Sequence, residues 1–171
     1  DVSNVETNTS LESTSSNTTK VSGYVGNGSI QGATVTVSKI INNSKTPFEN
    51  DEVNSSSLIT DENGFYSIEI SNYTGPIKIE VSSNENTIAT CEATLGCGHF
   101  TFSQDMKYSE INTEFNLSSI AYVSDGSTEV QSNVSVISHI TAELLKDTHI
   151  NEQSINITSA NIASLFSLEN N

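Results

Sequence analysis

The side chains in this sequence best suited to hold a soft metal ion are those of Cys91, Cys97 and His99. Thiolate and imidazole groups are donors that zinc prefers, but these three donors within nine residues lack the fourth ligand of a structural zinc site. Cys91 and Cys97 are the 2 cysteines of the chain and lie close together. We therefore predict a disulfide between Cys91 and Cys97 and no resident metal.

Oxygen donors gather in two acidic segments. Asp61, Glu62 and Asn63 lie in one predicted turn, and Asp51 lies in the loop before it. Calcium binds carboxylate and amide oxygens but needs about six to eight of them, and no EF-hand loop is present. A calcium ion held by Asp51, Asp61 and Asn63 requires the fold to bring the two segments together. The alternative, a tight hairpin turn with no ion, is the one that the sequence favours.

No arrangement of residues in the sequence predicts catalysis. His139 lies beside the apolar stripe of a predicted helix and His149 near the end of that helix, and the sequence marks no Ser or Cys partner for either. Neither an HExxH motif nor a GxSxG nucleophile elbow occurs in the chain. We therefore predict that the protein is not an enzyme.

The tyrosines are the aromatic candidates for stacking against a sugar ring, because a phenol ring combines an apolar face with a polar tip. We expect about half of them to belong to the core. Tyr73 and Tyr108, which lie in predicted turns, are the best candidates for a glycan-binding surface. The chain contains 5 tyrosines: Tyr24, Tyr66, Tyr73, Tyr108 and Tyr122.

The charge of the chain disfavours some classes of partner. The chain has 21 Asp and Glu against 6 Lys and Arg, for a formal net charge of −15. This charge repels the phosphates of nucleic acids and the headgroups of anionic lipids, so we expect no nucleic-acid partner. No apolar run has the length of a membrane span, so we expect no membrane insertion. The same charge suits divalent cations or simple solubility.

The composition is typical of an exposed β protein outside the cell. Only 34% of the residues are hydrophobic, and about 40% are Ser, Thr or Asn. The chain begins with Asp rather than Met, so we expect a mature or trimmed product that is secreted or lies on the outer cell surface. Nine Asn-x-Ser/Thr sequons carry no meaning in a bacterial protein, but they would indicate a glycosylated surface protein in a eukaryote.

Short alternating segments, separated by Gly, Asn and Asp turns, predict a mainly β protein. Ile77, Ile79 and Val81 recur with period two, which places them on one face of a strand. The order of such segments predicts a β-sandwich. We expect strands at residues 21–25, 33–38, 57–60, 65–70, 77–82, 87–92 and 115–123.

The chain divides into three predicted parts. Residues 1–20 are almost wholly polar and are expected to form a linker or a docked N-terminal strand. Residues 21–124 are expected to form the β-sandwich domain, in which the long polar loop 42–56 is a candidate binding edge. Residues 125–171 are expected to form a helical extension that packs on the sandwich or leads to a further domain.

The period changes from strand to helix within this extension. Val136, Ile140 and Leu144 fall at helical spacing, and Thr158 is expected to cap a second helix that carries Ile162. Each helix has one apolar stripe and therefore needs another surface to pack on.

Two hairpins and several later segments resemble a known family. The matching residues are Gly23, Val25, Gly32, Ala33, Val35 and Val37 in the first hairpin and Thr60, Asp61, Asn63, Gly64, Phe65 and Tyr66 in the second. Asn63 and Gly64 are expected to supply the positive-φ positions of the second turn. These hairpins resemble the carboxypeptidase-regulatory-like, prealbumin-type modules of secreted bacterial surface proteins and lipoproteins. The segments TGPIKIEVSS, ATCEATLGCGHFTF, VSVISHITAELL and ITSANIASLFSL resemble large gammaproteobacterial extracellular proteins in which helices follow the sandwich.

The resemblance implies an Ig-like/transthyretin-like β-sandwich of about seven strands with one or two short C-terminal helices. It implies a non-catalytic extracellular module of a bacterial adhesin or lipoprotein that spaces, or presents a surface to, glycans or protein partners. Two alternatives stay open. One is a fibre or pilus-like subunit whose N-terminal segment adds a strand to a neighbouring copy. The other is the accessory domain of a secreted hydrolase.

Overall fold

The computed structural model describes residues 17–26, 29–55, 57–111 and 114–168, and it confirms the predicted mainly β sandwich. The strands in these ranges are β1 (Thr18–Tyr24), β2 (Ile30–Gln31), β3 (Thr34–Ile41), β4 (Ser44–Pro47), β5 (Ser57–Ile59), β6 (Phe65–Ser71), β7 (Gly75–Ser82), β8 (Ile88–Thr90), β9 (Asp105–Lys107), β10 (Asn116–Val123) and β11 (Glu129–Gln131). The helices are α1 (Tyr108–Ile111), α2 (Val136–Leu145) and α3 (Glu152–Leu168).

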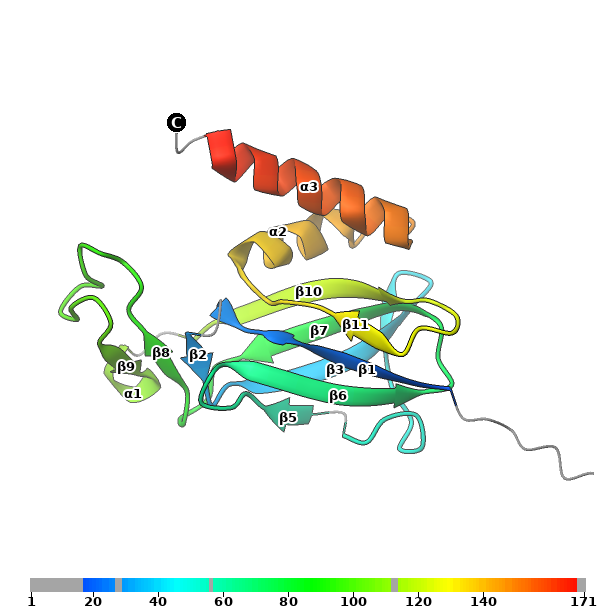
Figure 1. Ribbon diagram of the computed structural model, residues 1–171, viewed down its shortest axis with the longest axis horizontal. Helices are drawn as coiled ribbons and strands as arrows, with labels where there is room; N and C mark the ends of the chain where they lie inside the picture. The colour runs from blue at the N-terminus through cyan, green and yellow to red at the C-terminus, as the bar shows by residue number, and fades with distance from the viewer. Residues whose placement is uncertain (1–16, 27–28, 56, 112–113, 169–171) are drawn as a thin grey trace, which may run out of the picture.

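Two sheets pack face to face (Figure 1). The first sheet has the strand order β11-β1-β6. The second has the order β10-β7-β3-β4, and in it β3 also pairs with the short strand β5. Neighbouring strands are antiparallel except β1 and β11, which run parallel. A small third sheet, β2-β8-β9, lies at one end of the sandwich and carries the loop that contains the two cysteines (Figure 1).

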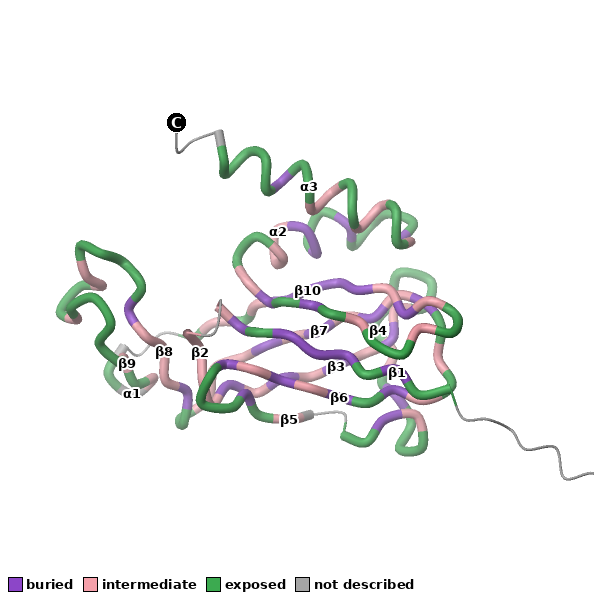
Figure 2. Tube along the Cα trace, in the orientation of Figure 1, coloured by how far each residue is buried: buried purple, intermediate pink, exposed green. Residues whose placement is uncertain are grey.

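Alternating side chains fill the space between the two large sheets. Ile77, Ile79 and Val81 of β7 are all 0% exposed, as their period-two spacing predicts. Tyr66 and Ile68 of β6 join them in one hydrophobic cluster, which Figure 2 shows as the purple segments of the facing strands. Burial of an aliphatic side chain of this size contributes about 1.5–3 kcal/mol to folding, so this cluster is the main source of stability.

The turn before β6 is a hairpin turn of the kind that the sequence favours. The Asp61 Oδ1 atom accepts hydrogen bonds from the backbone N–H groups of Asn63 and Phe65, both at 2.8 Å. Gly64 has a φ of 66°, which a residue without a Cβ adopts at little cost. Asn63 does not have a positive φ, so the prediction that it shares this role is wrong.

The predicted loop 42–56 contains a strand, β4. Asn42 and Asn43 have φ angles of 51° and 60°, and they connect β3 to β4 through the pair Ile41 and Ser44. Two consecutive positive φ angles are typical of the tight turn that matches the twist of a hairpin, and Asn tolerates them best after Gly. The Asn-Asn pair was therefore a hairpin signal in a segment expected to be irregular.

Both ends of the predicted sandwich domain differ from expectation. β1 begins at Thr18, so its first three residues fall within 1–20, the segment expected to form a linker or a docked N-terminal strand, and residues 1–16 lie outside the described residues. β11 returns to the sandwich from the segment expected to be helical and pairs with β1. A Cβ atom on Gly23 of β1 would lie 2.0 Å from the Ser132 carbonyl oxygen, so only glycine allows this approach.

Each long helix begins at a reciprocal capping arrangement. The Ser135 hydroxyl accepts from the Ser138 N–H, and the Ser138 hydroxyl accepts from the Ser135 N–H, at the start of α2. At the start of α3, Asn151 Oδ1 accepts from the Ser154 N–H at 2.8 Å, and Ser154 Oγ accepts from the Asn151 N–H at 2.9 Å. The prediction of Thr158 as the cap is wrong, because the Asn151 pair starts the helix earlier.

The helices form a layer over the outer face of the second sheet. Ile120 of β10 packs with Ala142, Leu145 and Ile150 in a second, smaller hydrophobic cluster, and α3 packs on α2 (Figure 1). Within the described part of the chain, no helix combines the length and the apolar character needed to cross a bilayer.

Candidate binding groove beside Tyr122

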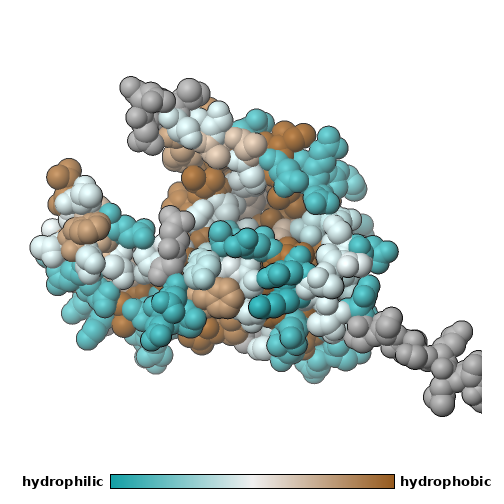
Figure 3. Space-filling view, viewed as in Figure 1, coloured by the Kyte–Doolittle hydropathy of each residue, from teal (hydrophilic) through white to brown (hydrophobic). Residues whose placement is uncertain are grey.

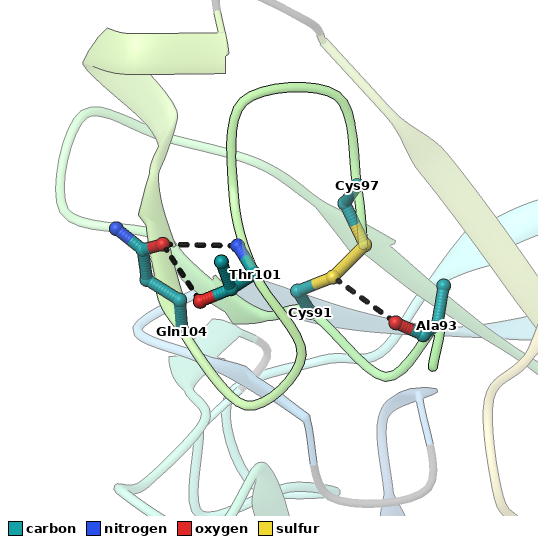
Figure 4. Close-up of a disulfide and its surroundings, with 5 residues drawn as sticks. All are labelled: Cys91, Ala93, Cys97, Thr101 and Gln104. Atoms are coloured by element: carbon teal, nitrogen blue, oxygen red, sulfur yellow. Dashed lines mark hydrogen bonds between the residues drawn. A yellow bond between two sulfur atoms is a disulfide. The ribbon is translucent and has the colours of Figure 1, made fainter. Parts of the chain in front are cut away.

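The predicted disulfide is present. Cys91 and Cys97 are bonded with a Cα–Cα distance of 5.9 Å, in the loop between β8 and β9 (Figure 4). Gln104 Oε1 accepts from the N–H and hydroxyl of Thr101 at 3.0 and 3.3 Å, which closes the other side of this loop (Figure 4). His99 is exposed, and because both sulfur atoms are used in the disulfide, they cannot join His99 in holding a metal.

The three residues of the calcium hypothesis do not come together. The Asp61 carboxylate caps the first residue of β6, whereas Asp51 lies beside Glu52, whose carbonyl oxygen accepts from the N–H of Ser71 at the other end of β6. A strand of this length spans about 20 Å at about 3.3 Å per residue, so Asp51 cannot share an ion with Asp61 and Asn63. Among the described residues, no group of three or more His, Cys, Asp or Glu side chains is placed to hold a metal ion.

The two tyrosines singled out for sugar stacking are partly buried. The Tyr73 hydroxyl donates to the Pro76 carbonyl oxygen at 2.8 Å, and its ring packs edge-on against Phe48 with centroids 5.2 Å apart. Burial raises the pKa of Tyr73 to about 12. Tyr108 is half-buried at the start of α1. Tyr73 supports the core instead of offering a free ring face.

A different tyrosine, Tyr122, is shared by three neighbouring surface depressions, which together we call the Tyr122 groove. It is half-buried near the end of β10, on the same outward face as Ile120, and it lines three adjoining cavities of about 600, 340 and 310 Å³. The first cavity is bordered by the start of α3, the second by the β3–β4 turn and the third by β11 and the inner side of α3. The side chains that line them are mostly amides and hydroxyls, among them Gln131, Asn133, Asn151, Gln153, Asn156 and Ser159.

The fold holds the walls of this groove in place. Tyr122 is paired with Pro76 across β10 and β7, one position before the end of this strand ladder, so the pairing fixes the position of its backbone. On the opposite wall, Asn151 is held by its capping bonds, and Glu152 accepts a hydrogen bond from the Ser124 hydroxyl at 3.4 Å. Among the described residues, no hydrogen bond to the Tyr122 hydroxyl is formed.

The groove brings together an aromatic ring and several amide side chains. An aromatic ring can stack on the C–H face of a sugar, and amide side chains offer both donors and acceptors to its hydroxyl groups. Glycoside hydrolysis commonly needs two carboxyl groups across the scissile bond. Glu152 is the only carboxylate among the described residues that line the three cavities.

His139 has a serine partner that the sequence did not mark. The Ser118 hydroxyl lies 3.0 Å from His139 Nδ1, and Glu143 lies one turn further along α2. Ser118 is only 1% exposed, so a substrate carbonyl has no path to its hydroxyl oxygen. The pair instead joins α2 to β10, together with the bond from the Ser138 hydroxyl to the Ser118 carbonyl oxygen.

Comparisons with family models, with curated proteins and with solved structures found no match for this chain. The function must therefore be inferred from the site itself, because a β-sandwich carries many unrelated functions.

Proposed function

We propose that this chain is a non-catalytic extracellular β-sandwich module that binds a glycan in the groove around Tyr122. The observation that carries the proposal is a half-buried tyrosine at the junction of three cavities that are lined by amide and hydroxyl side chains. Ligand sites are typically concave, with an apolar platform and a few convergent polar groups, and this groove has both features.

An extracellular location is supported by the disulfide, which persists in oxidising compartments, and by the strongly acidic composition. The resemblance to carboxypeptidase-regulatory-like modules of bacterial adhesins and lipoproteins would place the chain on a cell surface. In that setting the sandwich presents the groove to glycans of another cell or of the matrix.

A glycan array followed by titration calorimetry of the positive sugars tests the proposal. Tyr122→Ala should lower affinity at least about tenfold, because it removes the stacking face, whereas Tyr122→Phe should retain most of the affinity. Tyr108→Ala is the matched control and should bind like the unaltered protein. Equal binding by the Tyr122→Ala variant, or loss of binding in Tyr108→Ala alone, would place the site elsewhere.

The accessory-domain alternative is decided by the neighbouring sequence. A catalytic domain encoded next to this chain would make the groove the targeting site of a secreted hydrolase. The isolated chain should bind the sugar without releasing products, because a single carboxylate lines the groove among the described residues.

The fibre alternative has one supporting observation. β10 lies at the edge of the second sheet, so part of its backbone is open to an added strand. Sedimentation velocity across a wide concentration range distinguishes the fibre subunit from the binding module. A monomer at all concentrations supports the binding module, and concentration-dependent polymers support the fibre.

A further inference from the structure

A small pocket next to the Tyr122 groove combines an apolar floor with a cationic rim. Its volume is about 130 Å³, and it lies between the β3–β4 hairpin, β7, β10 and the end of α2. Ile120, Ala142 and Ile150 form the floor. The rim carries lysines from three separate elements, Lys45, Lys78 and Lys146.

The concentration of positive charge here is unusual for this molecule. The chain has 6 Lys and Arg in total, and three of them line this one pocket, although the net charge is −15. Salt screens charges beyond about 8 Å under physiological conditions, so the lysines and the carboxylates paired with them determine the local field, and distant acidic residues contribute little.

Two carboxylates orient the lysines but do not line the pocket. Glu80 contacts Lys45 at 2.7 Å and Lys78 at 3.3 Å, and Glu143 contacts Lys146 at 3.1 Å. The adjacent lysines hold the pKa values of both carboxyl groups below their usual range, so both are ionised at neutral pH. Asp147 also acts on Lys146, so three carboxylates lie near the three lysines. The described residues that line the pocket include no acidic side chain, so the lysines are the charged groups that face a ligand there.

The pocket is continuous with the groove. Ile120 and Tyr122 are next neighbours on one face of β10, about 7 Å apart at about 3.3 Å per residue. Ile40, Asn43 and Ile150 line both this pocket and the 340 Å³ cavity that reaches Tyr122. A sugar ring stacked on Tyr122 can therefore place a substituent between the lysines.

We infer that the glycan of the Tyr122 groove is an acidic one, with a carboxylate or sulfate substituent in the lysine-lined pocket. This inference rests on the proposed function. Lysine acts as a compact point charge and does not select between the two anionic groups by geometry. The volume of the pocket is close to that of an apolar cavity of about 150 Å³ that holds one benzene ring, so it accommodates the anionic substituent and not a second sugar ring.

Titration by NMR with three monosaccharides tests the inference. Glucuronate and glucose 6-sulfate represent the two anionic substituents, and glucose is the neutral match. We expect either or both anionic sugars to bind more tightly than glucose, to perturb the signals of Ala142 and Ile150, and to weaken as salt is added. A preference for one of them identifies the substituent.

Lysine variants separate this inference from the proposed function. Lys45 and Lys146 are 55% and 62% exposed, so the double variant Lys45→Gln/Lys146→Gln should fold normally. It should lower affinity for the anionic sugar about fivefold or more and leave glucose unchanged. Lys107→Gln/Lys20→Gln removes the same charge far from the pocket and should have no effect.

The outcomes are distinguishable. Equal affinity for charged and neutral sugars, or equal loss in both double variants, overturns the acidic-glycan inference while leaving a Tyr122-dependent neutral site intact. Lysine-dependent binding of glucuronate that is unaffected by Tyr122→Ala supports the anionic pocket and rejects the groove as its extension. The absence of binding by all three sugars at tens of millimolar overturns both.

Discussion

Two regions of the molecule, the core between the sheets and the helical layer over β10, contain similar apolar side chains. These side chains are buried to different degrees. Ile77 and Ile79 in the core are 0% exposed, whereas Leu144 of α2 and Ile157 of α3 are 56% and 52% exposed. Brown, apolar surface is visible around the helices and at the tip of the 91–104 loop (Figure 3). Stability therefore resides mainly between the sheets, and the helical layer leaves cavities beside Tyr122.

The largest effect should come from the core. Ile79→Ala removes a fully buried side chain from the centre of β7 and leaves a cavity, which should cost about 3–4 kcal/mol of unfolding free energy. Chemical denaturation monitored by circular dichroism measures this cost. Ile157→Ala in the helical layer is the matched control and should cost under about 1 kcal/mol. Similar losses of unfolding free energy in the two variants would contradict the conclusion that the core contributes more stability than the helical layer.

The disulfide should have the next largest effect, confined to one end of the molecule. Cys91→Ala/Cys97→Ala opens a short loop, so the chain-entropy cost is about 2 kcal/mol or less. Hydrogen exchange should increase in residues 91–104 and stay unchanged in β3, β7 and β10. Increased exchange throughout β7 would show that the loop supports the sandwich. Glycan binding should not change, since the loop and the groove lie on different elements.

Sequence patterns predicted the core better than the layer, for a physical reason. The row of Ile77, Ile79 and Val81 is a local period that one strand displays by itself. β11 is only three residues long, and its place beside β1 depends on Gly23, more than a hundred residues earlier. No local pattern marks such a contact.

The candidate site was predicted only in part for the same reason. The disulfide joins neighbours in sequence, so the chain shows it directly. Tyr122 could have been favoured over Tyr73 from its alternation with Ile120 on an outward strand face, but its groove depends on α3, whose start at Asn151 was not recognised. The lysine rim gathers residues about 30 to 100 positions apart, which only the fold brings together.

Acid should destabilise the sandwich by protonating Glu52, which forms a partly buried ion pair with Lys39. Lys39 contacts Glu52 at 2.7 Å, with the lysine side chain 11% exposed and lying over the ring of Phe48 at 5.4 Å. The bond from Lys39 holds the pKa of Glu52 below its usual value of 4.5. A lowered carboxyl pKa gives stability that is present above pH 4.5 and is lost as the pH falls through the lowered value.

Thermal midpoints measured from pH 7 down to pH 3 check this expectation. The midpoint should be nearly constant above about pH 5 and fall below it. Glu52→Gln should be less stable at neutral pH and should show a shallower acid decline, because the group that titrates is gone. Glu69→Gln, on an exposed position of β6, is the control and should keep the full decline. An unchanged profile in Glu52→Gln would show that other carboxyl groups control acid stability.

The smallest effect should be near the C-terminal end of α3, and it tests whether the helical layer is packed more loosely than the core between the sheets. Leu165 is 60% exposed, whereas Ile162, one turn earlier, is 8% exposed. Leu165→Ser should change the unfolding free energy by under about 0.5 kcal/mol, because the side chain already contacts water. Ile162→Ser should cost about 2 kcal/mol or more, since it places a hydroxyl among apolar neighbours. Denaturant titration of both variants provides the test. A cost above about 1 kcal/mol for Leu165→Ser would mean that Leu165 is covered in solution, and sedimentation of the same variant would show whether a second copy covers it.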